Sequence, residues 1–137
     1  MAVQTQSPTN LFYAEIAKLL AAEITVANGA VKSVTCIKTS CTADETQTLV
    51  GITQCTDTGL DLQNADTVKS SQTTVDNDTV EVDNVFTAAT GDTVLGFGVL
   101  NDADTILYAI CCFAAGVVMQ AADTLTVEMK MQMKKGS

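Results

Sequence analysis

Apolar and polar residues alternate most clearly near the end of the chain. From Leu125 to Met133 every second residue is Leu, Val or Met, and Thr, Glu, Lys and Gln stand between them. A period of two places alternate side chains on opposite faces of a β-strand. Residues 79–87 alternate in a similar way. Both segments are therefore predicted to be strands with one buried face.

A short phrase, aspartate followed by threonine and an aliphatic residue, marks the beginning of strands. It occurs five times, starting at Asp66, Asp78, Asp92, Asp104 and Asp123. Asp closes turns through its side chain, whereas Thr, Val and Ile favour the pleated surface of a strand. Further strands are predicted at 31–38, 48–55, 67–74, 93–100 and 105–113. Many short strands separated by turns predict a mainly β protein, an antiparallel β-sandwich of which a jelly roll is one variant.

One segment near the N-terminus has the period of a helix instead. Its apolar stripe consists of Phe12, Ile16, Leu19 and Leu20. This spacing predicts one α-helix over residues 10–23, with Asn10 as its N-cap. The predicted organisation is a flexible arm at 1–9, a single domain at 10–133 and a solvated tail at 134–137.

Two predicted strands are apolar on both faces. In residues 93–100 the second face carries Gly96 and Gly98, where another backbone or side chain can approach closely. Residues 105–122 carry no charge, and we expect a strand, a turn at 114–116 and a second strand there, with no membrane span. Strands with two apolar faces need a cover on each, either another sheet or a partner chain. The pattern favours an oligomer.

The charged residues exclude several classes of function. The 137 residues include 16 acidic residues, seven lysines, no arginine and no histidine, for a net charge of −9. A chain of this composition lacks the basic footprint of a nucleic-acid binder and is repelled by anionic membranes. Without histidine it has no Ser-His-Asp or Cys-His arrangement. We therefore expect no nucleic acid, no membrane, no cofactor, no metal and no catalytic residues.

Five cysteines offer the remaining reactive groups, at Cys36, Cys41, Cys55, Cys111 and Cys112. Cys36, Cys41 and Cys55 supply three thiolates, one fewer than a structural zinc site needs. Cys111 and Cys112 are adjacent on a strand and are expected to point to opposite faces. Because the number is odd, one thiol is free or bonded to another chain. We hypothesise that at least one of Cys36, Cys41 and Cys55 forms a disulfide with a loop or a neighbouring subunit.

The last strand and two acidic turns have two interpretations each. Met129, Met131 and Met133 are expected to be core residues, with contact to a neighbouring subunit as the alternative. Residues 76–78 and 101–104 are rich in Asp and Asn. They lack the glycine and distal glutamate of a calcium-binding loop, so we interpret them as turns.

The second half of the chain has a characteristic succession of strand and turn sequences. Residues 92–109 form a glycine-containing strand, a polar hairpin and a strand with the sequence Leu-Tyr-Ala, and residues 122–127 read Ala-Asp-Thr-Leu-Thr-Val. These motifs, the helix at 10–23 and residues 42–51 are similar to small structural proteins of tailed bacteriophages. The five cysteines and the absence of arginine depart from that group's pattern.

This resemblance implies a virion component and transfers no catalytic residues. The expected function is that of a capsid decoration protein that binds the major capsid protein and other copies of itself, through residues 1–10 and 39–47. Residues 1–10 lack a secretory signal, so we expect synthesis in the host cytoplasm. A collar or tail-fibre subunit is the alternative within this class. From another class, the alternative is a β-sandwich adhesin or carbohydrate-binding module.

Overall fold

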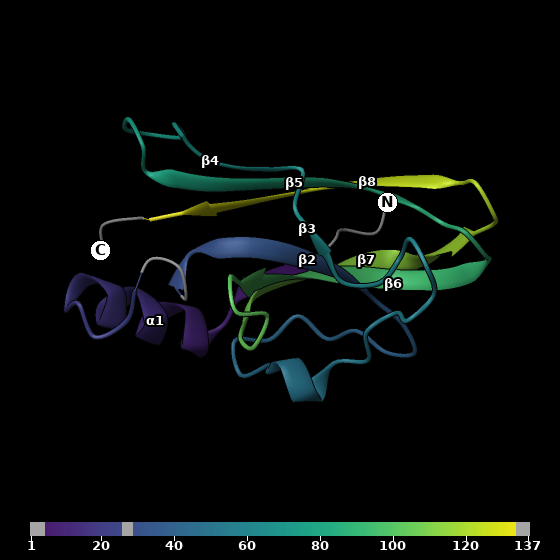
Figure 1. Ribbon diagram of the computed structural model, residues 1–137, viewed down its shortest axis with the longest axis horizontal. Helices are drawn as coiled ribbons and strands as arrows, with labels where there is room; N and C mark the ends of the chain where they lie inside the picture. The colour runs from purple at the N-terminus through teal and green to yellow at the C-terminus, as the bar shows by residue number, and fades with distance from the viewer. Residues whose placement is uncertain (1–4, 26–28, 134–137) are drawn as a thin grey trace.

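The computed structural model describes residues 5–25 and 29–133, which form two antiparallel sheets and one α-helix (Figure 1). The five-stranded sheet has the order β1-β7-β6-β2-β3, and the three-stranded sheet has the order β4-β5-β8. The elements are β1 (Thr5–Pro8), α1 (Asn10–Leu20), β2 (Val31–Ile37), the 3-10 helix η1 (Leu49–Gly51), β3 (Gln63–Asn64), β4 (Thr67–Ser71), β5 (Thr79–Thr87), β6 (Asp92–Asn101), β7 (Leu107–Met119) and β8 (Thr124–Gln132). The prediction of a mainly β protein with two antiparallel sheets and an N-terminal helix is confirmed.

The main core lies between the two sheets. Strands β5 and β8 contribute Val82, Phe86, Val127, Met129 and Met131, all at most 7% exposed. The five-stranded sheet supplies the facing layer, which includes the fully buried Val34, Val94 and Val99. Burying one such side chain stabilises the fold by about 1.5–3 kcal/mol. The alternation in β5 and β8 therefore has the predicted cause, and the outer positions of both strands are polar except Val85.

The five-stranded sheet has a second buried face, which the chain itself covers. Its cluster consists of Ile37, Leu100, Leu107, Ile110 and Cys112. Cys41, Ala43, Leu49 and Ile52 pack against this cluster, from the segment around η1 below the sheet in Figure 1. The two-faced apolar strands are thus explained within one chain, and they no longer indicate an oligomer.

Residues 5–8, predicted as part of a flexible arm, form an edge strand instead. β1 pairs antiparallel with β7, from Thr5 opposite Cys112 to Pro8 opposite Ala109. The segment is polar and gives no strand signal, so its conformation is set by the backbone groups that β7 offers. Residues 1–4 of the predicted arm and the predicted tail at 134–137 lie outside the described residues.

The helix begins and ends earlier than its pattern predicts. Thr9, not Asn10, is the N-cap, because its Oγ1 accepts a hydrogen bond from the Phe12 N–H at 3.3 Å and donates one to the Leu107 carbonyl at 2.6 Å. Thr9 and Asn10 are both residue types that form N-caps. The hydrogen bond to β7 fixes Thr9, and not Asn10, in this position. At the other end, the Glu23 N–H bonds the Lys18 carbonyl at 2.8 Å, so the helix is closed before residue 23.

Two further element predictions are wrong. Residues 48–55 form the 3-10 helix η1 and a single bridge from Ile37 to Gln54 rather than a strand. β7 is one continuous strand, without the turn predicted at residues 114–116. From Cys112 to Val117 it nevertheless advances five residues while β6 advances two, from Gly96 to Val94. The Ala-Ala-Gly segment therefore lies in a special β-bulge of β7, with three extra residues relative to β6.

Replacing Ala22 by glycine is expected to stabilise the protein by about 1 kcal/mol, because Ala22 closes α1 with a left-handed backbone (φ 58°) that costs an L-residue roughly this amount. Thermal unfolding followed by circular dichroism measures the change. The control is Ala21→Gly, one residue earlier, where φ is −80° and the backbone is right-handed. Glycine there should leave stability unchanged or lower it. Equal effects at both positions would contradict the assignment.

Candidate subunit-contact surface

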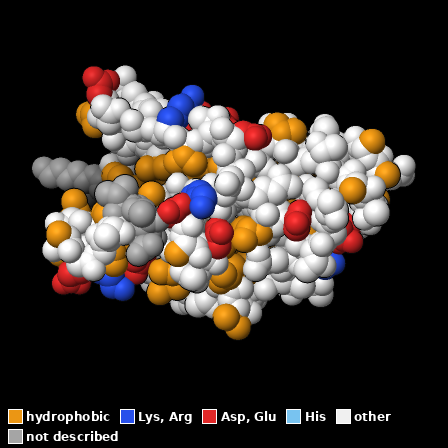
Figure 2. Space-filling view, in the orientation of Figure 1, with side chains coloured by type: hydrophobic (Ala, Val, Ile, Leu, Met, Phe, Trp, Pro, Cys, Tyr) orange, Lys and Arg blue, Asp and Glu red, His pale blue; other side chains and the backbone are white. Residues whose placement is uncertain are grey.

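An apolar groove, here called the helix groove, lies between α1 and the three-stranded sheet. It is lined by Phe12, Ile16, Leu19, Gly29, Ala30, Val31, Val68, Lys69, Ser70, Val80 and Met133, and its volume is about 360 Å³. Figure 2 shows hydrophobic side chains gathered between the upper and lower layers on the left of the view. The groove is open at the surface and mostly apolar, which suits contact with a complementary apolar surface.

The groove exists because the helix stripe is only partly covered. Phe12 is 4% exposed, whereas Ile16 and Leu19 are half-buried. Above them β4 is a short, polar edge strand of five residues, which leaves Val68 42% exposed. The sequence signal for the groove was the apolar stripe of residues 10–23, but the stripe alone does not show which part remains uncovered.

A second hollow, here called the β8 hollow, runs beside the free edge of β8. It has a volume of about 230 Å³ and is lined by Gln6, Ser7, Pro8, Phe12, Tyr13, Ala109, Met129, Lys130, Met131, Gln132 and Met133. Met129 and Met131 are 3% and 7% exposed and belong to the main core, which confirms their core interpretation. Only Met133, at 42% exposure, stands at the surface as a candidate subunit contact.

Every lysine of the described residues forms an ion pair with a carboxylate of the same chain. The pairs are Lys18 with Glu15, Lys32 with Asp102, Lys38 with Asp57 and Asp92, Lys69 with Glu81, and Lys130 with Glu81 and Glu128. Most other carboxylates, among them Asp44, Glu45 and Asp76, have no lysine partner within the described part. The surface therefore offers few cations to an anionic ligand, and it favours neutral or basic partners.

Three carboxylates gather on the outer face of the three-stranded sheet. Ligand oxygens of Glu81, Asp83 and Glu128 lie within 4.8 Å of one another. Lys130 is 3.0 Å from Glu128 and 3.9 Å from Glu81, and Lys69 is 3.6 Å from Glu81. Two ammonium groups thus already supply counter-charge, and we interpret the cluster as a cross-strand ion-pair network.

The predicted acidic turns are turns in the structure. In the first, Asp78 accepts hydrogen bonds from Thr73 N and Thr74 N at 2.8 and 2.9 Å and from the Gln132 side chain at 2.8 Å. These hydrogen bonds hold the pKa of Asp78 well below its usual range. The bond from Gln132 contributes most, and the backbone bonds follow. In the second, the side-chain oxygen of Asn101 accepts hydrogen bonds from the backbone N–H groups of Thr105 and Ile106, both at 2.9 Å.

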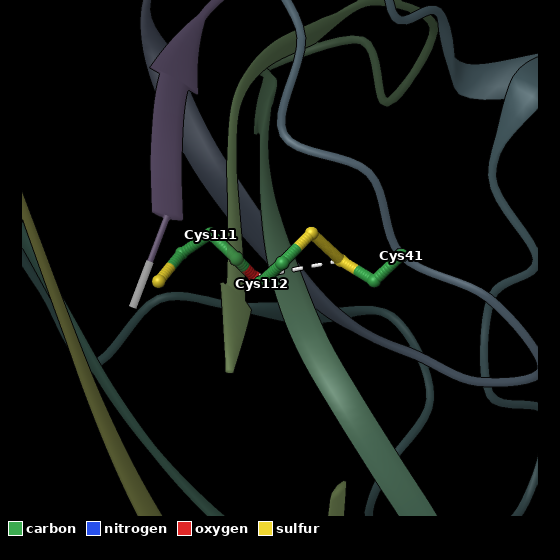
Figure 3. Close-up of a disulfide and its surroundings, with 3 residues drawn as sticks. All are labelled: Cys41, Cys111 and Cys112. Atoms are coloured by element: carbon green, nitrogen blue, oxygen red, sulfur yellow. Dashed lines mark hydrogen bonds between the residues drawn. A yellow bond between two sulfur atoms is a disulfide. The ribbon is translucent and has the colours of Figure 1, made fainter. Parts of the chain in front are cut away.

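A disulfide joins Cys41, in the segment around η1 that covers the second face of the five-stranded sheet, to Cys112 of β7 (Figure 3). The sequence hypothesis included Cys41 but not its partner. A Cβ atom added at Gly96 would lie 2.8 Å from the Cys41 sulfur, so the expectation of close approach at this glycine is confirmed. The side chain of Cys111 points away from the bridge (Figure 3), as the alternation along a strand requires.

The three other cysteines are free and buried in the main core. Cys36 and Cys55 form neither a disulfide nor a surface contact, and the Cys55 N–H bonds the Cys36 carbonyl at 2.8 Å. Burial raises the pKa of Cys55 to about 11 and raises those of Cys36 and Cys111 as well. These thiols are thus held in the neutral, poorly nucleophilic form.

Replacing both Cys41 and Cys112 by serine is expected to lower the free energy of unfolding by roughly 2–4 kcal/mol, since the bridge closes a loop spanning 71 residues. Reductant should lower the unfolding midpoint of the wild-type protein and leave that of the double variant unchanged. Cys111→Ala, which keeps the bridge, serves as the control and should respond to reductant like wild type. Identical mobility of the wild type with and without reductant in gel electrophoresis would argue against the bridge.

Asp78→Asn is expected to lower the thermal midpoint by a few degrees at pH 7, because the amide cannot accept all the bonds of the carboxylate. A carboxyl with a depressed folded pKa contributes stability above its unfolded pKa, near 4, and loses it as the pH falls through the folded value. The difference between variant and wild type should therefore shrink below pH 4. Asp76→Asn is the matched control, an exposed neighbour in the same turn, and it should have little effect at either pH. A constant difference from pH 7 to pH 2 would contradict this role.

Of the described helices, none is long and apolar enough to cross a membrane. No family model, curated protein or solved structure matches the chain.

Proposed function

We propose that this protein is a non-enzymatic structural subunit of a virion, and specifically a capsid decoration protein that binds neighbouring capsid subunits. The observation that carries the proposal is the helix groove. It is an uncovered apolar surface on a molecule that otherwise buries its apolar residues in two clusters, one on each face of the five-stranded sheet. An added subunit stabilises a shell because it binds only the assembled state. The resemblance of residues 92–109 and 122–127 to phage structural proteins supports the same role.

The chemistry of the surface fits this kind of partner. The rim of the groove carries Lys69, which is already paired with Glu81 at 3.6 Å, so a partner meets apolar side chains on a molecule whose net charge is −9. A capsid surface with apolar residues surrounded by lysine or arginine would complement both. The partner of this proposal is therefore the major capsid protein.

The disulfide is also compatible with a particle that leaves the cell. Disulfides persist in oxidising surroundings and are rare in the cytosol. A subunit made in the host cytoplasm and carried out on a particle experiences both conditions. The Cys41–Cys112 bridge would then fasten the covering segment once the particle is released.

A carbohydrate-binding function receives less support from the aromatic residues. All six aromatic residues lie within the described part of the chain, and Tyr13 is the only exposed one, at 54%. Tyr108 is 1% exposed and its hydroxyl donates to the Gly29 carbonyl at 2.8 Å. A sugar-stacking platform of two or more rings is thus not formed at the described surface.

The test uses particles purified from a host culture that produces the chain. We expect mass spectrometry to find the protein in many copies per particle, and imaging to place it on the shell. Its removal should lower the temperature at which the particles release their nucleic acid. A few copies at the collar or tail, or binding to host cells without the particle, would overturn the decoration role.

A pair of variants connects binding to the groove. Val68→Asp places a charge on the groove rim and should reduce binding of the purified protein to stripped particles at least tenfold. Val85→Asp is the matched control, because Val85 is 47% exposed and outside the groove whereas Val68 is 42% exposed. Equal binding by both variants would remove the groove from the contact.

A further inference from the structure

The free edge of β8 differs from the other sheet edges of the described structure. β1 has four residues and ends in Pro8, β3 has two residues, and β4 is a five-residue polar strand. β8 has nine residues and pairs with β5 along its whole length without a register shift, while no strand of residues 5–25 or 29–133 lies on its other side. Proteins commonly protect edges by shortness, proline, bulges, inward charges or charged side chains such as lysine. β8 is long and has no proline, bulge or inward charge, and its charged residues are one glutamate and one lysine, Glu128 and Lys130.

We propose that the free edge of β8 binds β8 of a second copy of this chain, antiparallel and centred on Met129. The two three-stranded sheets would then join into one six-stranded sheet across a two-fold axis. This inference goes beyond the proposed function and does not depend on it, because it concerns the isolated protein and not its place in a particle.

The order of charges along β8 identifies the second copy as the occupant. In an antiparallel pair centred on Met129, Glu128 of each chain stands opposite Lys130 of the other chain. Both side chains lie on the outer face and are about half exposed, at 52% and 53%. A two-fold interface brings the same patch of both copies together, so it must be self-complementary. The Glu128 and Lys130 pair meets this condition twice in each dimer.

The three-carboxylate cluster adds a second electrostatic reason. Asp83 and Glu128 face each other directly in the β5–β8 register, and like charges in this position are destabilising. One Asp83 carboxylate oxygen is buried and accepts no hydrogen bond within the described structure. Lys130 of a second copy would bring an additional positive charge next to Glu128 and reduce this repulsion.

The inner face of the strand is equally suited to the pairing. The same register places Met129 opposite Met129 and Val127 opposite Met131, which continues the apolar inner layer. The β8 hollow lies beside this edge, between β8 and the residues Pro8 and Tyr13, and provides room for the added side chains. Strand addition at a sheet edge uses this combination of backbone bonds and pockets for alternate side chains.

Sedimentation of the full chain over a range of concentrations tests the proposal. We expect the wild type to form a dimer. Glu128→Lys and Lys130→Glu should each weaken the dimer roughly tenfold, because each places like charges opposite each other twice. The combined variant Glu128→Lys with Lys130→Glu keeps the composition and restores complementarity, so it should regain wild-type association.

The matched control is Lys69→Glu, which changes the net charge by the same amount as Lys130→Glu but lies on β4, at the other edge of the same sheet. It should dimerise like wild type, and circular dichroism should show that all variants are folded. Amide exchange in β8 should slow as the concentration of wild-type protein rises. A wild-type protein that stays monomeric at millimolar concentration overturns the proposal, as does a dimer that Lys69→Glu weakens as much as Lys130→Glu.

Discussion

The structure depends on one constraint: the five-stranded sheet is apolar on both faces and must be covered on both. Adjacent residues of β6, Val99 and Leu100, are each fully buried, in different core clusters. The three-stranded sheet covers one face. The other is covered by a segment whose only regular element is η1, and such a segment gains little order from its own backbone bonds. The Cys41–Cys112 bridge fastens this segment to the sheet, and the absence of a side chain at Gly96 leaves room for the Cys41 sulfur.

The three-stranded sheet is the opposite case, and the surfaces of the molecule follow from it. Only its inner face is apolar, so its outer face can carry the ion pairs of Glu81 with Lys69 and Lys130. It is also narrower than the sheet it covers, with two free edges. The helix groove opens beside β4 and the β8 hollow beside β8. Both candidate contact surfaces therefore result from covering a wide sheet with a narrow one.

The sequence predicts the elements whose periodicity arises from burial on one face. β5 and β8 lie within one residue of their predicted ranges, since alternation there reflects the burial of one face. β2 and β6 also lie close to their predicted ranges, although both are buried on both faces. Prediction from the sequence fails where long-range contacts determine the conformation. β1 has no apolar pattern and forms only because β7 offers it backbone partners, and residues 48–55 are apolar enough for a strand but lie over a sheet face. The disulfide partner of Cys41 was equally hidden, because pairing among five cysteines depends on tertiary distance and not on spacing.

The net charge of −9 and the local charge pattern of β8 act on association in opposite directions, and ionic strength decides between them. At 0.01 M salt the screening length is about 30 Å, so the whole negative charge of one copy repels the other. At 0.15 M it falls to about 8 Å, and charges far from the interface are largely screened. In the proposed dimer the pairs of Glu128 with Lys130 would lie in direct contact and would keep most of their attraction. A protein with this surplus of acid can thus stay dispersed through long-range repulsion and still associate through a short, self-complementary strand edge when salt is moderate.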